Sequence, residues 1–263
     1  MVGIVGTIAG ADSVTATRLA VAMTLLQASI GSLNDRVDAP RDAGRKPGKP
    51  IPAGLVSPTA AGVVVVATGS LGVALSVPSG LATAALAIVV LVIGFAYDLW
   101  FKGTAWSWVP FALGIPLLPV FGWLGAAGGL PATFAILLPT AVVAGAALAI
   151  SNALADLDRD AAAGVESVAR RLGAGRAWVV HAVLLAVVIA AALLTLAVGD
   201  GRPGSGTGVA PTIAAVGASL VIGLGVALAR RGDAARRERA WELEAVGVGL
   251  LATAWLAGVP LGG

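Results

Sequence analysis

Long apolar runs, separated by short polar stretches, dominate the pattern of this chain. Eight of these runs are close to the ~20 residues that a helix needs to cross a bilayer. In lipid a long apolar run favours a helix, because a helix satisfies the hydrogen bonds of its own backbone. The pattern therefore predicts eight transmembrane helices, over residues 14–33, 58–77, 79–97, 107–125, 131–153, 176–198, 209–230 and 243–261.

The composition agrees with an integral membrane protein. Hydrophobic residues make up 58% of the 263 residues and charged residues only 12%, with a mean hydropathy of +0.94. A soluble domain carries roughly 25% charged residues. The chain has no cysteine, which excludes disulfides, thiolate metal sites and cysteine nucleophiles. The 1–263 chain contains no stretch that predicts a separate water-soluble domain, so we expect a single polytopic membrane domain.

The positions of the basic residues predict the orientation. If the loop after the first helix is cytoplasmic, 15 of the 17 Lys and Arg residues lie in cytoplasmic loops or at their edges, and only Arg18 and Arg202 do not. This asymmetry satisfies the positive-inside rule. The frequent Ala, Gly and Val and the preference for Arg over Lys are typical of a GC-rich bacterial genome. We therefore expect a multi-pass protein of the plasma membrane.

Two acidic clusters stand at the ends of apolar runs. Each contains Asn, Asp and Asp at positions i, i+4 and i+8, a spacing that puts the three side chains on one face of a helix. The clusters are Asn34, Asp38 and Asp42, with Asp35 beside them, and Asn152, Asp156 and Asp160. Four predicted helices separate them, so both should lie on the cytoplasmic side and can converge on one cavity. Pro40 disfavours helix before it, which weakens the argument for Asp42.

The residue types in these clusters indicate a particular chemistry. Carboxylates beside a membrane are costly and need a reason, although charged loops often do no more than set topology. Mg²⁺ binds one or two carboxylates together with phosphate oxygens and water, and basic side chains bind the remaining phosphate charge. An amphiphilic substrate with a diphosphate head and a hydrocarbon body would fit. Loss of diphosphate leaves an allylic cation, which an apolar pocket protects from water and the Tyr97 ring can stabilise.

With these residues in view, the chain resembles the UbiA superfamily of membrane prenyltransferases. The resemblance rests on an NDxxDxxxD signature at residues 34–42 and a DxxxD signature at residues 156–160. Residues 49–54 resemble the family's RPxxSG element, and Tyr97 and Lys102 stand where the family places a Tyr and a Lys. It implies an all-α integral membrane protein, usually with nine helices around a central cavity that opens to the cytoplasmic side.

The resemblance also implies roles for individual residues. Mg²⁺ would be bound by Asn34, Asp35, Asp38, Asp42, Asp156 and Asp160. The diphosphate would be bound by Arg45, Lys49, Lys102 and Asn152. Catalysis would depend on Asp38, Asp156, Tyr97 and Lys102, with Tyr97 facing the reactive carbon.

Three departures from the family pattern bear on these roles. Lys49 stands where the family prefers Arg, which loses a bidentate fork. Tyr97 and Lys102 are five residues apart rather than four, so they would diverge on a straight α-helix. Eight helices are predicted rather than nine, and the apolar residues 1–12 resemble the end of a first helix. We expect either a longer gene product or a naturally short family member.

The function that these observations predict is a Mg²⁺-dependent prenyltransferase. It would move an isoprenoid group from a prenyl diphosphate to an unidentified small-molecule or lipid acceptor at the cytoplasmic side of the membrane, with no nucleic-acid partner. A terpene cyclase of the same superfamily is the first alternative. A lipid carrier or transporter is the second, but transporter sites usually lie near the bilayer midplane. His181 is interpreted as a packed or hydrogen-bonded residue and residues 230–244 as an amphipathic connector.

Overall fold

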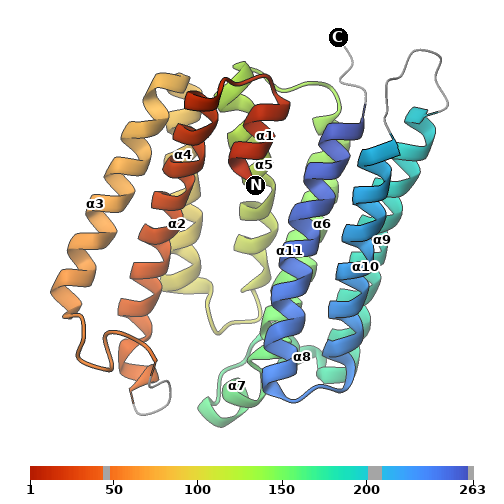
Figure 1. Cartoon of the computed structure of the whole chain (residues 1–263). Helices are drawn as coiled ribbons and strands as arrows, with labels where there is room; N and C mark the ends of the chain where they lie inside the picture. Colours follow the sequence, from red (N-terminus) through yellow and green to blue (C-terminus); the bar gives the residue numbers. More distant parts are fainter. Residues whose placement is uncertain (44–47, 201–208, 260–263) are drawn as a thin grey trace. The chain divides into compact units, whose positions relative to one another are not determined.

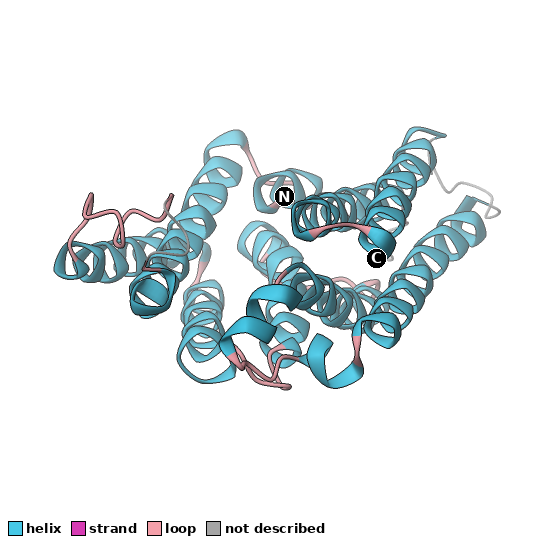
Figure 2. Ribbon diagram, turned by 90° about the horizontal axis from the view of Figure 1, so that it is seen from below, coloured by secondary structure: helices cyan, strands magenta, loops and turns pink. Residues whose placement is uncertain are grey.

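The structure is a computed structural model that describes residues 1–43, 48–200 and 209–259. Every regular element in these ranges is a helix, and no strand occurs among them (Figures 1 and 2). The predicted all-α fold class is therefore confirmed. A chain with such long apolar runs has no other way to pair its backbone groups within lipid.

Eight helices of the described residues are long and apolar enough to cross a membrane, as predicted. They are α2 (Ser13–Asp42), α3 (Pro58–Ser76), α4 (Leu81–Ala96), α5 (Trp108–Ala127), α6 (Phe134–Ala155), α9 (Ala174–Asp200), α10 (Val209–Arg231) and α11 (Ala234–Gly258). Shorter helices connect or precede them: α1 (Val2–Ile8), the 3₁₀ turn η1 (Val77–Ser79), the π-helical turn η2 (Tyr97–Phe101), α7 (Leu157–Ala163) and α8 (Val168–Leu172).

Two helices extend well beyond their apolar runs. α2 continues through Pro40 to Asp42, whereas the predicted helix ended at residue 33. Proline removes one helical hydrogen bond, but Pro40 lies on the exposed side and the next turn closes normally, with the Ala43 amide 3.1 Å from the Ala39 carbonyl. The weakened expectation for Asp42 was too pessimistic, because this residue lies on the helix.

The last helix also differs from its prediction. α11 begins at Ala234 rather than at residue 243, because the Asp233 side chain caps it by accepting from the Arg236 amide at 2.9 Å. An N-cap of this kind stabilises a helix end regardless of hydropathy. The stretch interpreted as a connector is therefore largely the first turns of α11. The predicted end at residue 261 lies outside the described residues.

The chain divides into two compact units. The N-terminal unit comprises residues 2–100 and 120–129, and the C-terminal unit comprises Met1 and residues 101–119 and 130–263. The division therefore falls inside η2, between residues 100 and 101, and again inside α5, which contains Pro116 and Pro119. The two acidic clusters belong to different units.

In the N-terminal unit, α2 packs against α1, α3 and α4. Small residues allow α2 and α3 to approach closely: a Cβ at Gly72 would lie 2.8 Å from Leu26 Cδ2. The Ser29 hydroxyl donates to the Val65 carbonyl at 2.7 Å and links the same two helices. Small residues and interhelical hydrogen bonds are the usual means of association in lipid. They hold α2, whose C-terminal end carries the first signature.

In the C-terminal unit, α6 packs against α9 and α11, and α10 packs against α11 (Figure 1). A Cβ at Gly145 of α6 would lie only 2.4 Å from the carbonyl oxygen of Phe111, so these segments touch at backbone distance. Beneath the second signature, Ile150 and Leu154 of α6 form a core with Val168, Ala169 and Ala177. This core fixes the end of α6 against α8 and α9.

Two ionisable side chains lie fully buried in the C-terminal unit. His181 of α9 and Glu244 of α11 have no exposed surface, and His181 Nε2 lies 3.3 Å from Glu244 Oε1. Gly225 of α10 makes room for them, since a Cβ there would lie 2.6 Å from Glu244 Cγ. The interpretation of His181 as a hydrogen-bonded residue is confirmed. The pair links α9 to α11 across their interface.

Candidate functional site

The first signature forms a cluster of carboxylates at the end of α2. Asp38 and Asp42, one helical turn apart, are buried to 5% and 7% exposure. Asp35 forms an ion pair with Lys49, which follows α2 in the chain. The structure therefore brings together four of the predicted residues of this unit, and Asn34 lies one turn before Asp38 on the same helix.

Lys49 lies in the electrostatic field of all three aspartates. Partial burial lowers the pKa of its ammonium group, but the hydrogen bond to Asp35 and the charges of Asp35, Asp42 and Asp38 outweigh that effect and raise the pKa above its usual value. Lys49 is therefore a stable cation beside the carboxylates at neutral pH. Its ammonium still carries no bidentate fork, as expected from the sequence.

A compact turn holds Lys49 in place. The Ala53 amide donates to the Lys49 carbonyl at 3.1 Å, and the Leu55 amide donates to the Pro50 carbonyl at 3.0 Å. Gly54 has a φ of 73°, a left-handed conformation that favours glycine. The turn thus requires a glycine at the last position of the 49–54 element. Arg45, the other predicted phosphate ligand nearby, lies outside the described residues.

Asp98 is a further member of this cluster that was not assigned a role from the sequence. It is 4% exposed, and its Oδ1 accepts a hydrogen bond of 2.8 Å from Asn34 Nδ2. Asn34 thus uses its amide nitrogen to bind a second carboxylate, and its amide oxygen remains the atom suited to a cation. The only signal in the sequence was an Asp next to Tyr97 at the end of an apolar run.

The backbone around Tyr97 changes how the Tyr97–Lys102 spacing is interpreted. Residues 97–101 form a π-helical turn, in which hydrogen bonds join residues five apart instead of four. The five-residue spacing was expected to make Tyr97 and Lys102 diverge on a straight α-helix. The π-turn has the period that this spacing requires, so that objection no longer holds.

The second signature occupies the junction of α6 and α7. Asn152 lies on α6, Asp156 at the junction and Asp160 on α7, and all three side chains are partly exposed. Helical hydrogen bonds continue through the junction, with the Asp156 amide 3.1 Å from the Asn152 carbonyl and the Asp160 amide 2.8 Å from the Asp156 carbonyl. The predicted i, i+4, i+8 spacing is therefore kept in the backbone.

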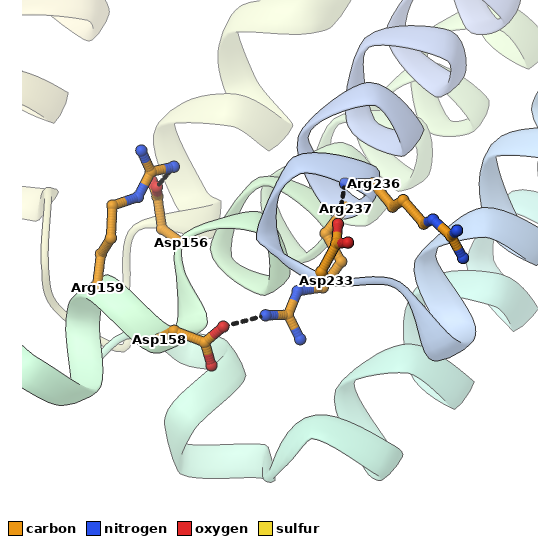
Figure 3. A network of polar contacts seen from close by, with 6 residues as sticks. All are labelled: Asp156, Asp158, Arg159, Asp233, Arg236 and Arg237. Carbon is orange, nitrogen blue, oxygen red and sulfur yellow. Dashed lines mark hydrogen bonds and ion pairs between the residues drawn. The ribbon is translucent and has the colours of Figure 1, made fainter. Parts of the chain in front are cut away.

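Asp156 and Asp160 differ in their electrostatic surroundings. Asp156 forms an ion pair with Arg159 (Figure 3). Partial burial raises the pKa of Asp160, and the neighbouring Asp156 carboxylate raises it further, while the charges of Arg159 and Arg170 act in the opposite direction. A cation that binds here would relieve the repulsion between the two carboxylates.

An ion pair joins the second signature to the last helix. Asp158 of α7 accepts from Arg237 in the first turn of α11 (Figure 3). Asp158 is largely exposed, whereas the Arg237 side chain is only 15% exposed. Arg237 thereby fixes α7 against the start of α11. The sequence offered no signal for this contact, since the arginines of this stretch only indicated topology.

Replacing Arg237 by Gln is expected to lower the activity of this site by up to about fivefold. This corresponds to the ~1 kcal/mol or less that an exposed ion pair contributes, since α7 would lose its anchor to α11. The reciprocal variant, Arg237→Asp with Asp158→Arg, should recover most of the loss. Arg236→Gln is the matched control, because Arg236 is exposed and adjacent. Steady-state kinetics in which the reciprocal pair is no better than the single variant would contradict this positioning role.

The donor set of the first cluster suits Mg²⁺. Within the described part of the chain, no three His, Cys, Asp or Glu side chains form a group that could hold a metal ion by themselves. Mg²⁺ does not need such a cage, because it is usually bound by one or two carboxylates together with substrate phosphates and water. The buried carboxylates of Asp38 and Asp42 are hard oxygen ligands of this kind. Both carboxylates are therefore suited to a metal that arrives with a phosphorylated substrate.

Comparisons with known proteins establish the family of the chain. The chain matches the UbiA prenyltransferase family over residues 1–255. It is 32% identical over 163 residues to the digeranylgeranylglyceryl phosphate synthase of Korarchaeum cryptofilum (strain OPF8). That match covers 60% of this chain and 57% of the relative, so the chain spans somewhat more than half of the relative's length.

Solved structures share the fold. The apo structure of a UbiA homolog from Aeropyrum pernix K1 has a TM-score of 0.76 at 17% identity, over 96% of this chain and 93% of that chain. A UbiA homolog from Archaeoglobus fulgidus bound to GPP and Mg²⁺ has a TM-score of 0.69 at 15% identity, over 97% of this chain and 94% of that chain. At these identities the likeness establishes the fold. Together with the family match over nearly its whole length, it shows that the chain belongs to the UbiA prenyltransferase family.

Proposed function

We propose that this protein is a Mg²⁺-dependent prenyltransferase that moves an isoprenoid group from a prenyl diphosphate to a lipid acceptor. The observation that carries the proposal is the cluster at the end of α2, where Asp38 and Asp42 are buried beside the Asp35–Lys49 ion pair. Buried carboxylates next to a permanent cation suit a metal–diphosphate group. The UbiA homolog from Archaeoglobus fulgidus bound to GPP and Mg²⁺ supports the same choice of ligand.

Each signature has a role in the proposed reaction. When bound, Mg²⁺ would neutralise the negative charge that develops on the departing diphosphate. Asn34, Asp35, Asp38 and Asp42 would be Mg²⁺ ligands in the N-terminal unit, and Asp156 and Asp160 would be Mg²⁺ ligands in the C-terminal unit. Lys49, Lys102, Arg45 and Asn152 would bind the diphosphate oxygens. Lys49 already stands beside the first-signature carboxylates as a charged donor, so little reorganisation is needed when the phosphate arrives.

Tyr97 would protect the reacting carbon. The face of its ring is electron-rich, so it can stabilise an allylic cation without capturing it. The five-residue spacing of Tyr97 and Lys102 equals the hydrogen-bond period of the π-turn that begins at Tyr97. Tyr97 would then contact the carbon while Lys102 contacts the leaving diphosphate. Exclusion of water by the surrounding apolar residues would leave the acceptor as the only nucleophile.

We infer an acceptor of the glyceryl phosphate class. The support is the 32% identity to the digeranylgeranylglyceryl phosphate synthase of Korarchaeum cryptofilum. A phosphorylated lipid suits a membrane-embedded enzyme, because its head can remain at the interface while its chains remain in lipid. The excess of basic residues on one side of the predicted topology supports a multi-pass protein whose active site faces the cytoplasm at the plasma membrane.

The proposal is tested with the protein reconstituted in liposomes. Geranyl, farnesyl and geranylgeranyl diphosphates are supplied with and without Mg²⁺, each with and without geranylgeranylglyceryl phosphate, and diphosphate release and lipid products are measured. We expect release that requires both Mg²⁺ and the acceptor, with one ether product by mass spectrometry. Release of a cyclic hydrocarbon or alcohol without acceptor would indicate a terpene cyclase instead. Metal-independent transport of the lipid without diphosphate release would indicate a carrier.

A further inference from the structure

The C-terminal unit contains an elongated apolar cavity of about 240 Å³ between α5, α6, α9 and α11. Its wall runs from Leu148 to Ile136 on α6 and from Ala245 to Trp255 on α11. At a rise of 1.5 Å per residue, these stretches are about 18 Å and about 15 Å long. The cavity therefore runs parallel to the helices, with the shape of a channel for an extended hydrocarbon chain.

The polar side-chain groups of the lining are already hydrogen-bonded within the protein, so a ligand need not offer them a partner. Thr140 contributes a hydroxyl to the wall, but that hydroxyl donates to the carbonyl of Ile136 in its own helix at 2.8 Å. The neighbouring residues of α6 and α9, such as Ala144 and Val188, are aliphatic. A cavity with satisfied polar groups and aliphatic walls favours a hydrocarbon over a polar molecule.

One end of the channel lies toward the second signature. Leu148 precedes Asp156 by eight residues, which is about 12 Å along the axis of α6, and Ile136 precedes it by twenty residues, about 30 Å. A ligand with its head at Asp156 would therefore reach the channel with its tail.

Trp255 stands at the opposite end. It follows Arg237, the partner of Asp158 beside the second signature, by eighteen residues, or about 27 Å of helix. The Trp255 side chain is 3% exposed, and its Nε1 donates to Thr195 Oγ1 at 2.6 Å. The Thr195 hydroxyl in turn donates to the Ala191 carbonyl at 2.6 Å. The indole is thus tied to the backbone of α9 and forms a rigid wall.

We propose that Trp255, held by Thr195, ends the channel for the hydrocarbon chain of the prenyl diphosphate and limits its length. The proposal rests on the proposed function, in which Asp156 and Asp160 of the second signature are also ligands of the metal–diphosphate group. Four chain carbons per isoprene unit, at C–C bonds of about 1.5 Å, advance an extended chain by about 5 Å. The roughly 12 Å between Asp156 and Leu148, together with the roughly 15 Å of channel that α11 lines, place Trp255 about 27 Å from the second signature. That distance corresponds to roughly five units, so donors of 15 to 25 carbons fit and an octaprenyl chain does not.

The test compares the donor-length preference of wild type, Trp255→Ala and Trp255→Phe. Farnesyl, geranylgeranyl and octaprenyl diphosphates are supplied at a fixed acceptor, and kcat/KM is measured for each. Trp255→Ala should raise the octaprenyl to geranylgeranyl ratio at least tenfold, and Trp255→Phe should raise it less. Thr195→Val, which removes the acceptor of the indole hydrogen bond, should raise it two- to threefold. Leu250→Ala is the matched control, because Leu250 is exposed on the same helix and does not line the channel.

A second readout separates this inference from the proposed function. Binding of the non-hydrolysable thiolodiphosphates of the same three chains is measured by the shift of the thermal unfolding midpoint, which requires no turnover. If wild type releases no diphosphate but Trp255→Phe gains binding of the octaprenyl analogue, the proposed function is wrong. The role of Trp255 in limiting chain length is then still supported. If the variants fold and turn over but keep the wild-type length ratio, the inference is wrong. A change in acceptor-chain preference instead of donor preference would also overturn it.

Discussion

Replacing Asp38 by Asn is expected to reduce prenyl diphosphate turnover about 100-fold or more while the protein stays folded. Asp38 is 5% exposed in a cluster with Asp42 and beside Lys49. Asn keeps the size of the side chain and removes its charge, so packing is preserved but a hard ligand for Mg²⁺ is lost. Removing a group that stabilises transition-state charge typically costs 10²–10³ in kcat. Diphosphate release at saturating Mg²⁺ measures the effect.

The matched control for Asp38 is Asp12→Asn on the same helix. Asp12 caps the other end of α2, where its carboxylate accepts from the Thr15 amide at 2.8 Å. Asn is as good an N-cap as Asp, so turnover should remain near wild type. Far-UV circular dichroism and the unfolding midpoint establish that both variants are folded. Turnover of Asp38→Asn within threefold of wild type would remove Asp38 from the metal site.

Replacing Glu244 by Ala is expected to lower the free energy of unfolding by about 3 kcal/mol. The variant leaves the fully buried His181 without the carboxylate that lies 3.3 Å from its Nε2. Leaving one member of a buried polar pair unpaired costs about 1–3 kcal/mol, and about 3–5 kcal/mol when the lost partner was charged. Reversible unfolding of the detergent-solubilised protein in SDS measures the change.

Two variants test whether the loss of stability comes from breaking the His181–Glu244 pair and not from any substitution on α11. Glu242→Ala lies two residues away on α11 and is exposed, so it should change stability by no more than about 0.5 kcal/mol. Replacing both His181 and Glu244 by Leu removes the whole pair and should be less harmful than Glu244→Ala alone. A double replacement at least as harmful as Glu244→Ala would mean that the unpaired His181 is not the source of the loss.

The sequence predicted the fold well because hydropathy and lipid leave few alternatives. The apolar runs determined the existence of all eight long helices. Helix ends were less accurate, because caps and polar turns decide them: the start of α11 depends on the Asp233 side chain, and the end of α2 on a tolerated Pro40. Neither is visible to a pattern of apolar residues.

The candidate site was predictable where motifs are local and not where contacts join distant residues. The positions of Asp38 on α2 and Asp156 at the α6–α7 junction follow from spacing along one helix. The Asn34–Asp98 bond and the Asp158–Arg237 pair join residues 64 and 79 positions apart, and nothing in the linear pattern relates them. The roles assigned to the signature residues stay predictions until variants are measured.

The π-turn at residues 97–101 has a consequence for how relatives are aligned. A π-turn is an α-turn that has gained one residue, and its extra residue is absorbed locally without rotating the helix that precedes it. A comparison that forces the Tyr and Lys of every family member into one fixed spacing would shift either Tyr97 or Lys102 against an unrelated residue. The one-position gap belongs between these two residues, so motif searches for this family should accept both spacings as the same feature.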